Sequence, residues 1–257
     1  MKHEYISFLT NTSKKKPDTM RNPSQTCPFC NTETLLKENN VVHQDGNKLL
    51  IKNKFPVLKN TDPLVLVENN TCDLDITTYP KNMLIDVLRY GLTTWLKMKN
   101  SGEYKSVLFF KNHGPYSAGS IHHPHMQIIG LRDKNPEQNL DFSTIDGVVI
   151  RENEHVKWSL STHPFTENHE FTIRMKGTSS LDFFAMALQS TTHYILNHLN
   201  TKYKSYNLCF YHVNDEIIVK ILDRRPTSAL LLGYSLSQVP DNLEHIAEEL
   251  RSLYPFN

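Results

Sequence analysis

The order of predicted strands and helices repeats along the chain, and this repeat limits the possible folds more than any other feature. The first half is expected to contain two strands, a helix and two further strands, at residues 48–58, 63–69, 80–98, 106–110 and 125–131. The second half is expected to contain three strands, a helix and two further strands, at residues 147–150, 155–160, 170–175, 181–199, 206–213 and 216–222. The two helices lie about a hundred residues apart, as do the strands that follow them, which predicts a duplicated α+β unit.

Apolar side chains recur at helical spacing in both predicted helices. They are Met83, Leu84, Val87, Leu88, Leu92, Trp95 and Leu96 in the first, and Phe184, Ala187, Leu188, Tyr194, Ile195 and Leu199 in the second. A last helix is expected at 242–253. Because only the polar stretch 132–139 separates the halves, we expect one pseudo-symmetric body with a first half at 1–135 and a second half at 136–257.

Composition and charge exclude several classes of protein. The 257 residues include 28 Lys and Arg against 27 Asp and Glu, and this net charge of +1 is too low for binding nucleic acid through bulk charge. No apolar run reaches the length of about 18 residues that a membrane span needs. Four cysteines are too few for a disulfide scaffold. The polar segment 1–26 has no apolar signal core, so we expect it to be a mobile or docking arm of a cytoplasmic protein. The simplest interpretation of Lys14–Lys16 is a solvated surface, and a phosphate contact is the alternative.

The sequence Cys27-Pro28-Phe29-Cys30 places two thiols at a spacing that can hold one zinc ion. A thioredoxin-like redox pair has the same spacing, but it belongs between a strand and a helix, whereas the flanking residues here are typical of turns. A closed structural zinc site needs two further ligands from elsewhere in the chain.

Cys72 and His123 are the best candidates for these two ligands. Cys72 follows a predicted strand in a loop that can reach a metal, and a loop thiol without a metal is the alternative. Cys209 lies in an apolar strand and is expected to be a small buried side chain. A zinc site formed by Cys27, Cys30, Cys72 and His123 would leave no position for water, and it would therefore be structural.

A segment rich in glycine and serine leads into a pair of histidines, and together they indicate phosphate chemistry. Strand alternation places His123 and His125 on one face, so one imidazole can bind a metal while the other stays free. The preceding segment supplies side-chain donors and flexible backbone at Asn112, Gly114, Gly119 and Ser120. This pattern favours a phosphate cradle beside a neutral histidine nucleophile, and two metal ligands or two surface residues are the alternatives.

Four segments resemble the galactose-1-phosphate uridylyltransferase branch of the histidine-triad (HIT) superfamily. They are residues 27–30, 53–58, 110–120 and 123–127. In the last of them Gln127 stands where triad hydrolases carry a third histidine and the transferase branch carries glutamine. The resemblance covers most of the chain. It implies an α+β fold with a duplicated HIT-like unit, an antiparallel sheet with helices packed on it, an N-terminal zinc knuckle and a degenerate second half.

The resemblance also implies roles for individual residues. His125 would be the nucleophile that takes a nucleotidyl group as a covalent phosphoramidate, and Gln127 would hydrogen-bond the phosphoryl oxygens. His123 would ligate zinc, and its backbone carbonyl would orient the His125 ring. Nucleoside and phosphate contacts are implied for Asn53, Phe55, Asn112 and Ser120.

Some positions depart from the family pattern. Ala118 replaces a glycine two residues before the serine, and Cys72 replaces a histidine while still offering a metal ligand. The family's hexose-recognising segment resembles 232–235, where Ser235 stands in place of a glutamate. Serine cannot make the paired hydrogen bonds of a carboxylate to sugar hydroxyls, which argues against galactose 1-phosphate as the substrate. Residues 218–221 occupy the place where a repeated histidine pair would stand, so no second metal site is expected.

The expected function is nucleotidyl transfer. A nucleoside diphosphate compound, such as a nucleotide sugar, would give its nucleotidyl group to His125, and a phosphorylated acceptor would then take it in a ping-pong reaction. The same adduct would also serve hydrolysis or phosphorolysis of a dinucleoside polyphosphate. A nucleotide-binding regulatory module without turnover is the alternative from another class. The family implies a homodimer, and we expect neither nucleic acid nor a membrane as a partner.

Overall fold

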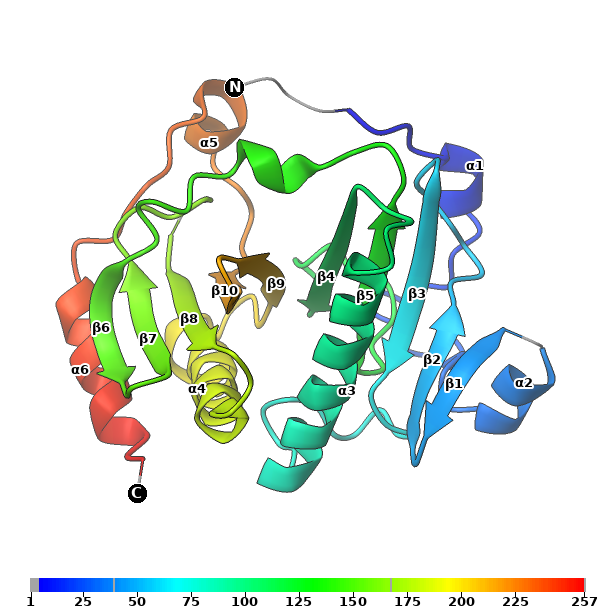
Figure 1. The fold of residues 1–257 in the computed structure, drawn as a ribbon, viewed down its shortest axis with the longest axis horizontal. Helices are drawn as coiled ribbons and strands as arrows, with labels where there is room; N and C mark the ends of the chain where they lie inside the picture. Colours follow the sequence, from blue (N-terminus) through cyan, green and yellow to red (C-terminus); the bar gives the residue numbers. More distant parts are fainter. Residues whose placement is uncertain (1–4, 39, 167, 257) are drawn as a thin grey trace. The chain divides into compact units, whose positions relative to one another are not determined.

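The computed structural model describes residues 5–38, 40–166 and 168–256, which form two compact units, 1–139 and 140–257 (Figure 1). In each unit helices pack on an antiparallel sheet, and this confirms the expected α+β fold class. None of the helices within the described ranges is long and apolar enough to cross a membrane.

Unit 1 carries its strands in the spatial order β1-β2-β3-β5-β4. The strands are β1 (Val41–Asp45), β2 (Lys48–Lys52), β3 (Thr61–Val67), β4 (Ser106–His113) and β5 (His125–Leu131). The helices are α1 (Thr10–Ser13), α2 (Thr32–Lys37) and α3 (Lys81–Lys99), followed by a 3-10 turn, η1 (Pro136–Asn139). Strand β5 therefore lies between β3 and β4, and its first residue, His125, is paired with Val67 of β3.

Unit 2 repeats this topology. Its strands are β6 (Gly147–Glu152), β7 (Val156–Ser161), β8 (Glu170–Lys176), β9 (Tyr206–Val213) and β10 (Glu216–Asp223). Its helical segments are α4 (Leu181–Tyr194), a π-helical turn η2 (Ile195–Leu199), α5 (Ala229–Tyr234) and α6 (Leu243–Leu253). The spatial order β6-β7-β8-β10-β9 matches that of unit 1 strand for strand, which confirms the duplication expected from the sequence.

Helix α3 covers one face of the unit 1 sheet, where it runs across β4 and β5 (Figure 1). Gly91 allows a close approach, because a Cβ atom there would lie 2.8 Å from the Phe109 ring. Trp95 is buried and donates its indole N–H to the carbonyl of Val107 at 2.7 Å. Along β5, Met126 and Ile128 are buried toward this helix. Alternation along the strand therefore directs His125, Gln127 and Ile129 to the opposite face.

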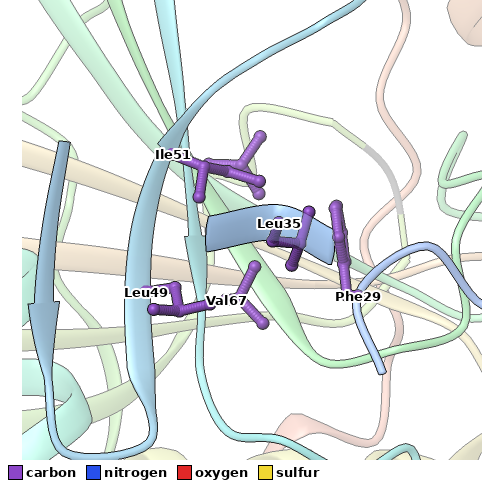
Figure 2. Close-up of a cluster of buried hydrophobic side chains, with 6 residues drawn as sticks. Phe29, Leu35, Leu49, Ile51 and Val67 are labelled. Carbon is purple, nitrogen blue, oxygen red and sulfur yellow. The ribbon is translucent and has the colours of Figure 1, made fainter. Parts of the chain in front are cut away.

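A cluster of buried apolar side chains covers that opposite face near β2 and β3 (Figure 2). It consists of Phe29, Leu35, Leu49, Ile51, Val65 and Val67, with Cys27 packed against it. Burying each of these large side chains contributes about 1.5–3 kcal/mol. The cluster therefore fixes the turn that carries Cys27 and Cys30, together with α2, against the sheet.

Helix α4 covers one face of the unit 2 sheet, and a buried ion pair lies on the other. Lys220 Nζ donates to Glu170 Oε1 at 2.6 Å and to Ser161 Oγ at 3.1 Å, and both charged side chains are almost fully buried. The Lys220 ammonium also lies 4.5 Å from the centre of the Phe165 ring. The Phe165 backbone N–H donates to the other Glu170 carboxylate oxygen at 2.8 Å, so each charged atom of this pair has a partner within the protein.

The structure differs from the predicted elements at a few places. The strand expected at 48–58 ends at Lys52, because the Asn53 side chain accepts a hydrogen bond from the Phe55 backbone N–H at 2.8 Å and turns the chain before Pro56. The helix expected at 181–199 changes to a π-helical turn after Tyr194. Strand β1 and the short helices α1, α2 and α5 were not predicted.

Candidate active site and metal centre

Cys27, Cys30, Cys72 and His123 come together, although 96 residues separate the first from the last. All of their ligand atoms lie within 4.8 Å of one another. His123 Nδ1 is 3.6 Å from Cys27 Sγ and 3.4 Å from the Sγ atoms of Cys30 and Cys72. A tetrahedral zinc ion with bonds of about 2.0–2.3 Å needs ligand-to-ligand edges of roughly 3.5–3.8 Å, so this group can hold a metal such as zinc.

The His123 ring is held so that its Nδ1 atom faces the three thiols. Its Nε2 atom lies 2.8 Å from the carbonyl oxygen of Asn69, and the ring is buried. A proton on Nε2 that is donated to this carbonyl leaves the Nδ1 lone pair for a metal. The Phe29 ring packs with its edge toward His123 and His125, at centroid distances of 5.9 and 5.4 Å. The four ligand atoms and the hydrogen bond that orients His123 therefore fit a four-coordinate metal site.

The His125 ring uses Nδ1 for a hydrogen bond and keeps Nε2 available for chemistry. Its Nδ1 donates to the backbone carbonyl of His123 at 2.7 Å, which leaves the Nε2 lone pair free. Within the described part of the chain, no hydrogen bond is made by Nε2. The residue is 8% exposed, and burial lowers the pKa of the ring to about 4. Imidazole in this state is neutral near pH 7, as a nucleophile must be.

A cavity of about 750 Å³ lies on the sheet face away from α3, and His125 forms part of its lining. Its lining brings together most of the residues singled out from the sequence: Asn53, Phe55, Asn112, Gly119, Ser120, His125 and Gln127. Apolar side chains that include Leu35, Ile51 and Val65 form another part of the wall. The cavity is therefore lined by an apolar surface on one part and, beside the His125 imidazole, by amide and hydroxyl groups.

Gly114 does not line the cavity. It adopts φ +82°, a conformation that favours glycine, and its carbonyl accepts a hydrogen bond from Ser117 Oγ at 2.6 Å. Ala118 also has positive φ, at +66°. The loop therefore makes its left-handed turn at an alanine where the family pattern has glycine, and still brings Gly119 and Ser120 to the cavity wall.

The N-terminal segment 13–21 docks on the protein, as one interpretation of the polar arm expected, and it forms a wall of the cavity, which the sequence did not indicate. Ser13, Lys16, Pro17, Asp18 and Arg21 all line the cavity. Backbone hydrogen bonds attach the segment to the loop: the Met20 N–H donates to the Ser120 carbonyl, and the His122 N–H donates to Thr19 Oγ1.

Lys16 corrects the interpretation of the lysine run as a solvated surface. Lys14 and Lys15 are exposed, but Lys16 is half-buried, and burial lowers the pKa of its ammonium. Burial is the main cause of the low pKa of the His125 ring, and the charges of Lys111 and, to a smaller extent, Lys16 lower it further. Nothing in the sequence distinguishes the third lysine from the other two, since its position depends on how the segment docks.

The fold is similar to that of solved uridylyltransferases, as the resemblance implied. The solved structure of a uridylyltransferase matches with a TM-score of 0.69 at 18% identity, covering 90% of each chain. An ADP-glucose phosphorylase from Arabidopsis thaliana, solved with bound ADP-glucose, matches with a TM-score of 0.69 at 15% identity, covering 97% of this chain and 95% of that one. At these identities the similarity concerns the fold.

The chain belongs to the DUF4931 family. Models of the N-terminal and C-terminal domains of DUF4931, a domain of unknown function, match residues 8–134 and 137–255. The crystal structure of a DUF4931 family protein from Bacillus cereus ATCC 10987 is 35% identical, with a TM-score of 0.76, and covers 84% of this chain and 100% of that one. No curated protein matches the chain at a significant level.

Proposed function

We propose that the protein is a nucleotidyltransferase that carries a nucleoside monophosphate on His125 between a nucleoside diphosphate compound and a phosphorylated acceptor. The observation that carries this proposal is the His125 ring itself. Its Nδ1 is hydrogen-bonded to the His123 carbonyl, and it lines a cavity together with Asn112, Ser120 and Gln127. Burial lowers the pKa of the ring to about 4, which favours the neutral form near pH 7. These three side chains offer the hydrogen-bond donors that a phosphate group needs.

The chemistry has two balanced halves. His125 Nε2 attacks the α-phosphorus of the donor, so that a P–N bond forms and the P–O bond to the leaving phosphate breaks. The leaving group takes the electron pair, and the positive charge that develops on the ring is stabilised by the His123 carbonyl. A phosphate oxygen of the acceptor then attacks the same phosphorus, the P–N bond breaks, and His125 returns as a neutral imidazole.

We further propose that zinc is the metal of the Cys27, Cys30, Cys72 and His123 centre, and that its role is structural. When bound, zinc would supply a rigid cross-link between the cysteine turn and the start of β5. His123 then contributes to the reaction through its backbone carbonyl, which holds the proton of His125 Nδ1 in place.

The test is to trap the covalent intermediate. Wild-type protein is incubated with a panel of labelled donors, including nucleotide sugars and dinucleoside polyphosphates, and quenched in alkali, because a phosphoramidate is labile in acid. Trypsin should release residues 112–132 as one peptide, and mass spectrometry should find the nucleotidyl group on His125 within it. Challenge of the labelled protein with orthophosphate, pyrophosphate or hexose phosphates should then identify the acceptor by loss of label.

Two outcomes would contradict the proposal. Nucleotide binding without label from any donor would favour a regulatory module. Label on a residue other than His125 would remove the assigned nucleophile. Discharge by orthophosphate alone would instead define the reaction as phosphorolysis, and discharge by galactose 1-phosphate would contradict the expectation drawn from Ser235, an exposed residue at the end of α5.

Lys16 is expected to bind the phosphates of the substrate. A hydrogen bond from a charged group contributes about 1.5–3 kcal/mol. Lys16→Met should therefore raise the nucleotide Kd roughly 10- to 100-fold, as measured by calorimetry. Lys15→Met, one residue away and exposed, is the matched control and should leave the Kd within about twofold. Equal effects of both substitutions would mean that the lysine run acts only through long-range charge.

A further inference from the structure

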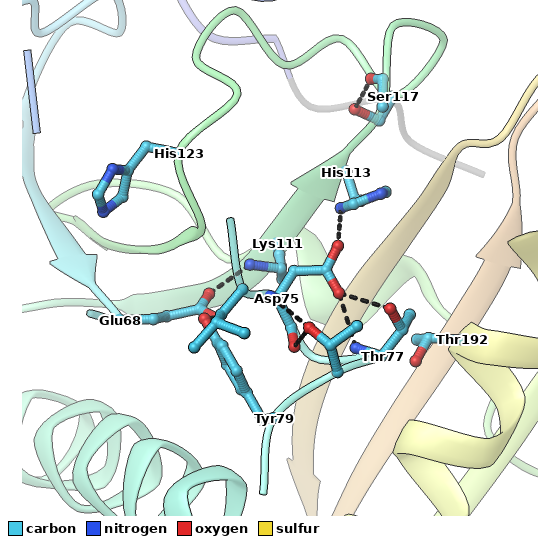
Figure 3. Close-up of polar contacts among 12 residues, drawn as sticks. Glu68, Asp75, Thr77, Tyr79, Lys111, His113, Ser117, His123 and Thr192 are labelled. Atoms are coloured by element: carbon cyan, nitrogen blue, oxygen red, sulfur yellow. Dashed lines mark hydrogen bonds and ion pairs between the residues drawn. The ribbon is translucent and has the colours of Figure 1, made fainter. Parts of the chain in front are cut away.

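A buried ion pair lies next to the segment 123–125, on the face of the sheet that α3 covers. Lys111 Nζ donates to Glu68 Oε1, and both side chains are almost fully buried (Figure 3). The Tyr79 hydroxyl donates to the other carboxylate oxygen at 2.9 Å. Burial and the Glu68 carboxylate raise the pKa of Tyr79, so its hydroxyl remains a donor. Asn69 Nδ2 in turn donates to the Tyr79 oxygen at 2.7 Å.

Residues of this network make a hydrogen bond to each of the three residues 123–125. The His123 ring donates to the Asn69 carbonyl at 2.8 Å, and the Pro124 carbonyl accepts from the Glu68 backbone N–H at 3.2 Å. The His125 carbonyl accepts from Lys111 Nζ at 3.4 Å. Glu68 and Asn69 thus contact the segment through their backbone, while the Glu68 carboxylate holds the ammonium that reaches its far end.

Lys111 cannot itself touch a ligand in the cavity. Its neighbours Phe110 and Asn112 line the cavity, and alternation along β4 directs Lys111 to the α3 face. A buried lysine of this kind needs a partner, because desolvation of an unpaired ammonium is costly. The pair therefore sits where it can fix the backbone beneath the nucleophile without contacting the substrate.

We propose that Lys111 and Glu68 are positioning residues that hold the His125 ring in line for attack on phosphorus. This inference rests on the proposed function of His125 and adds to it a means by which the ring is oriented. The His123 carbonyl orients the His125 ring. The position of that carbonyl depends on the segment 123–125, which is hydrogen-bonded to Asn69 at one end and to Lys111 at the other. Loss of the pair allows the segment to shift, and a misplacement on the order of 1 Å can slow a reaction about 100-fold.

The test replaces both charges together, because Lys111→Met alone would leave a buried, unpaired carboxylate. The double variant Lys111→Met/Glu68→Gln keeps the side-chain shapes and lacks the donor to His125. It should bind zinc and nucleotide as the wild type does, within about twofold to threefold, while its nucleotidyl adduct should form roughly 10- to 100-fold more slowly. Nitrogen-15 NMR of the histidines gives a readout without turnover: His125 should be a single Nδ1–H tautomer in the wild type and a mixture in the variant.

Unit 2 offers the matched control. Lys220 and Glu170 form a buried pair of the same kind, remote in sequence from the cavity residues, so Lys220→Met/Glu170→Gln should change stability without altering the labelling rate of folded protein or the His125 tautomer. A wild-type rate and a single tautomer in Lys111→Met/Glu68→Gln would overturn the inference. So would a parallel loss of zinc, nucleotide binding and labelling, which would indicate a folding role alone.

Two further outcomes keep the two proposals distinct. If no donor labels the wild type but the tautomer still changes in the variant, the transferase proposal fails and the positioning role stands. If the double variant does not fold, Tyr79→Phe removes only the hydroxyl between Asn69 and Glu68. It should mix the tautomers in the same way to a smaller extent, and an unchanged tautomer would overturn the inference.

Discussion

Replacing Cys72 with serine is expected to release the metal and to loosen unit 1. A structural zinc contributes about 10–16 kcal/mol in small zinc domains, which is comparable to the whole stability of a typical domain. Here the apolar cluster of Figure 2 would still hold part of the cysteine turn, so the full amount is not expected to be lost. A loss of only about 3 kcal/mol would already lower the Tm by roughly 6–12 °C.

Metal analysis and calorimetry together measure this effect. Wild-type protein should contain one zinc per chain, and Cys72→Ser should contain far less and unfold at a lower temperature. Cys209→Ser is the matched control, since burial raises the pKa of that thiol to about 11 and it lies in β9, outside the cluster of metal ligands. A wild-type protein with well under one zinc per chain would contradict the zinc centre. Full zinc content in Cys72→Ser would show that Cys72 is not one of its ligands.

Replacing His125 with glutamine is expected to abolish the covalent adduct. The loss in rate should be on the order of 10⁴-fold or more, the scale seen when a nucleophile is removed. Nucleotide binding should persist, because Asn112, Ser120 and Lys16 remain in the cavity wall. The measurement is the rate of label incorporation under single-turnover conditions, with nucleotide affinity determined in parallel.

The neighbouring histidine provides the control for this substitution. His122 is exposed and contacts Thr19 through its backbone N–H, so His122→Gln should form the adduct at nearly the wild-type rate. Similar losses in both variants would mean that the whole segment had been disturbed. Label retained in His125→Gln would show that another residue is the nucleophile.

The repeated architecture and the metal cluster could be predicted from the sequence for different reasons. Strong apolar periodicity sets α3 and α4, and β-branched runs set β3, β5 and β10, so these elements follow from local preference and burial. Cysteine and histidine carry so specific a chemistry that Cys27, Cys30, Cys72 and His123 stood out before their proximity was known. Strand alternation likewise predicted that His123 and His125 lie on one face, and the Phe29 ring packs against both imidazoles.

What could not be predicted depends on contacts between distant segments. Strand β1 is mostly exposed, and its sequence VVHQD carries little apolar signal. Lys111 looks like an ordinary surface lysine beside Asn112, and Glu68 comes within its reach only because β5 pairs with both β3 and β4. Lys16 is distinguished from Lys14 and Lys15 only by the docking of residues 19–20 on the loop at 120–122.

The docking of the N-terminal segment also bears on how the protein is handled. Among the described residues 5–26, four hydrogen bonds attach this segment to the rest of unit 1. Two join residues 7–9 to residues 57–59: the Lys59 N–H donates to the Ser7 carbonyl, and the Leu9 N–H donates to the Val57 carbonyl. The other two join it to the loop at 120–122: the Met20 N–H donates to the Ser120 carbonyl, and Thr19 Oγ1 accepts from the His122 N–H. Trimming the chain back to Thr26 would leave all the metal ligands and His125 in place, yet it would open one side of the cavity to water. A shortened protein of this kind would keep its reactive groups but lose one wall of the site that encloses a small molecule. Preparations that differ only in this segment should therefore differ in ligand affinity.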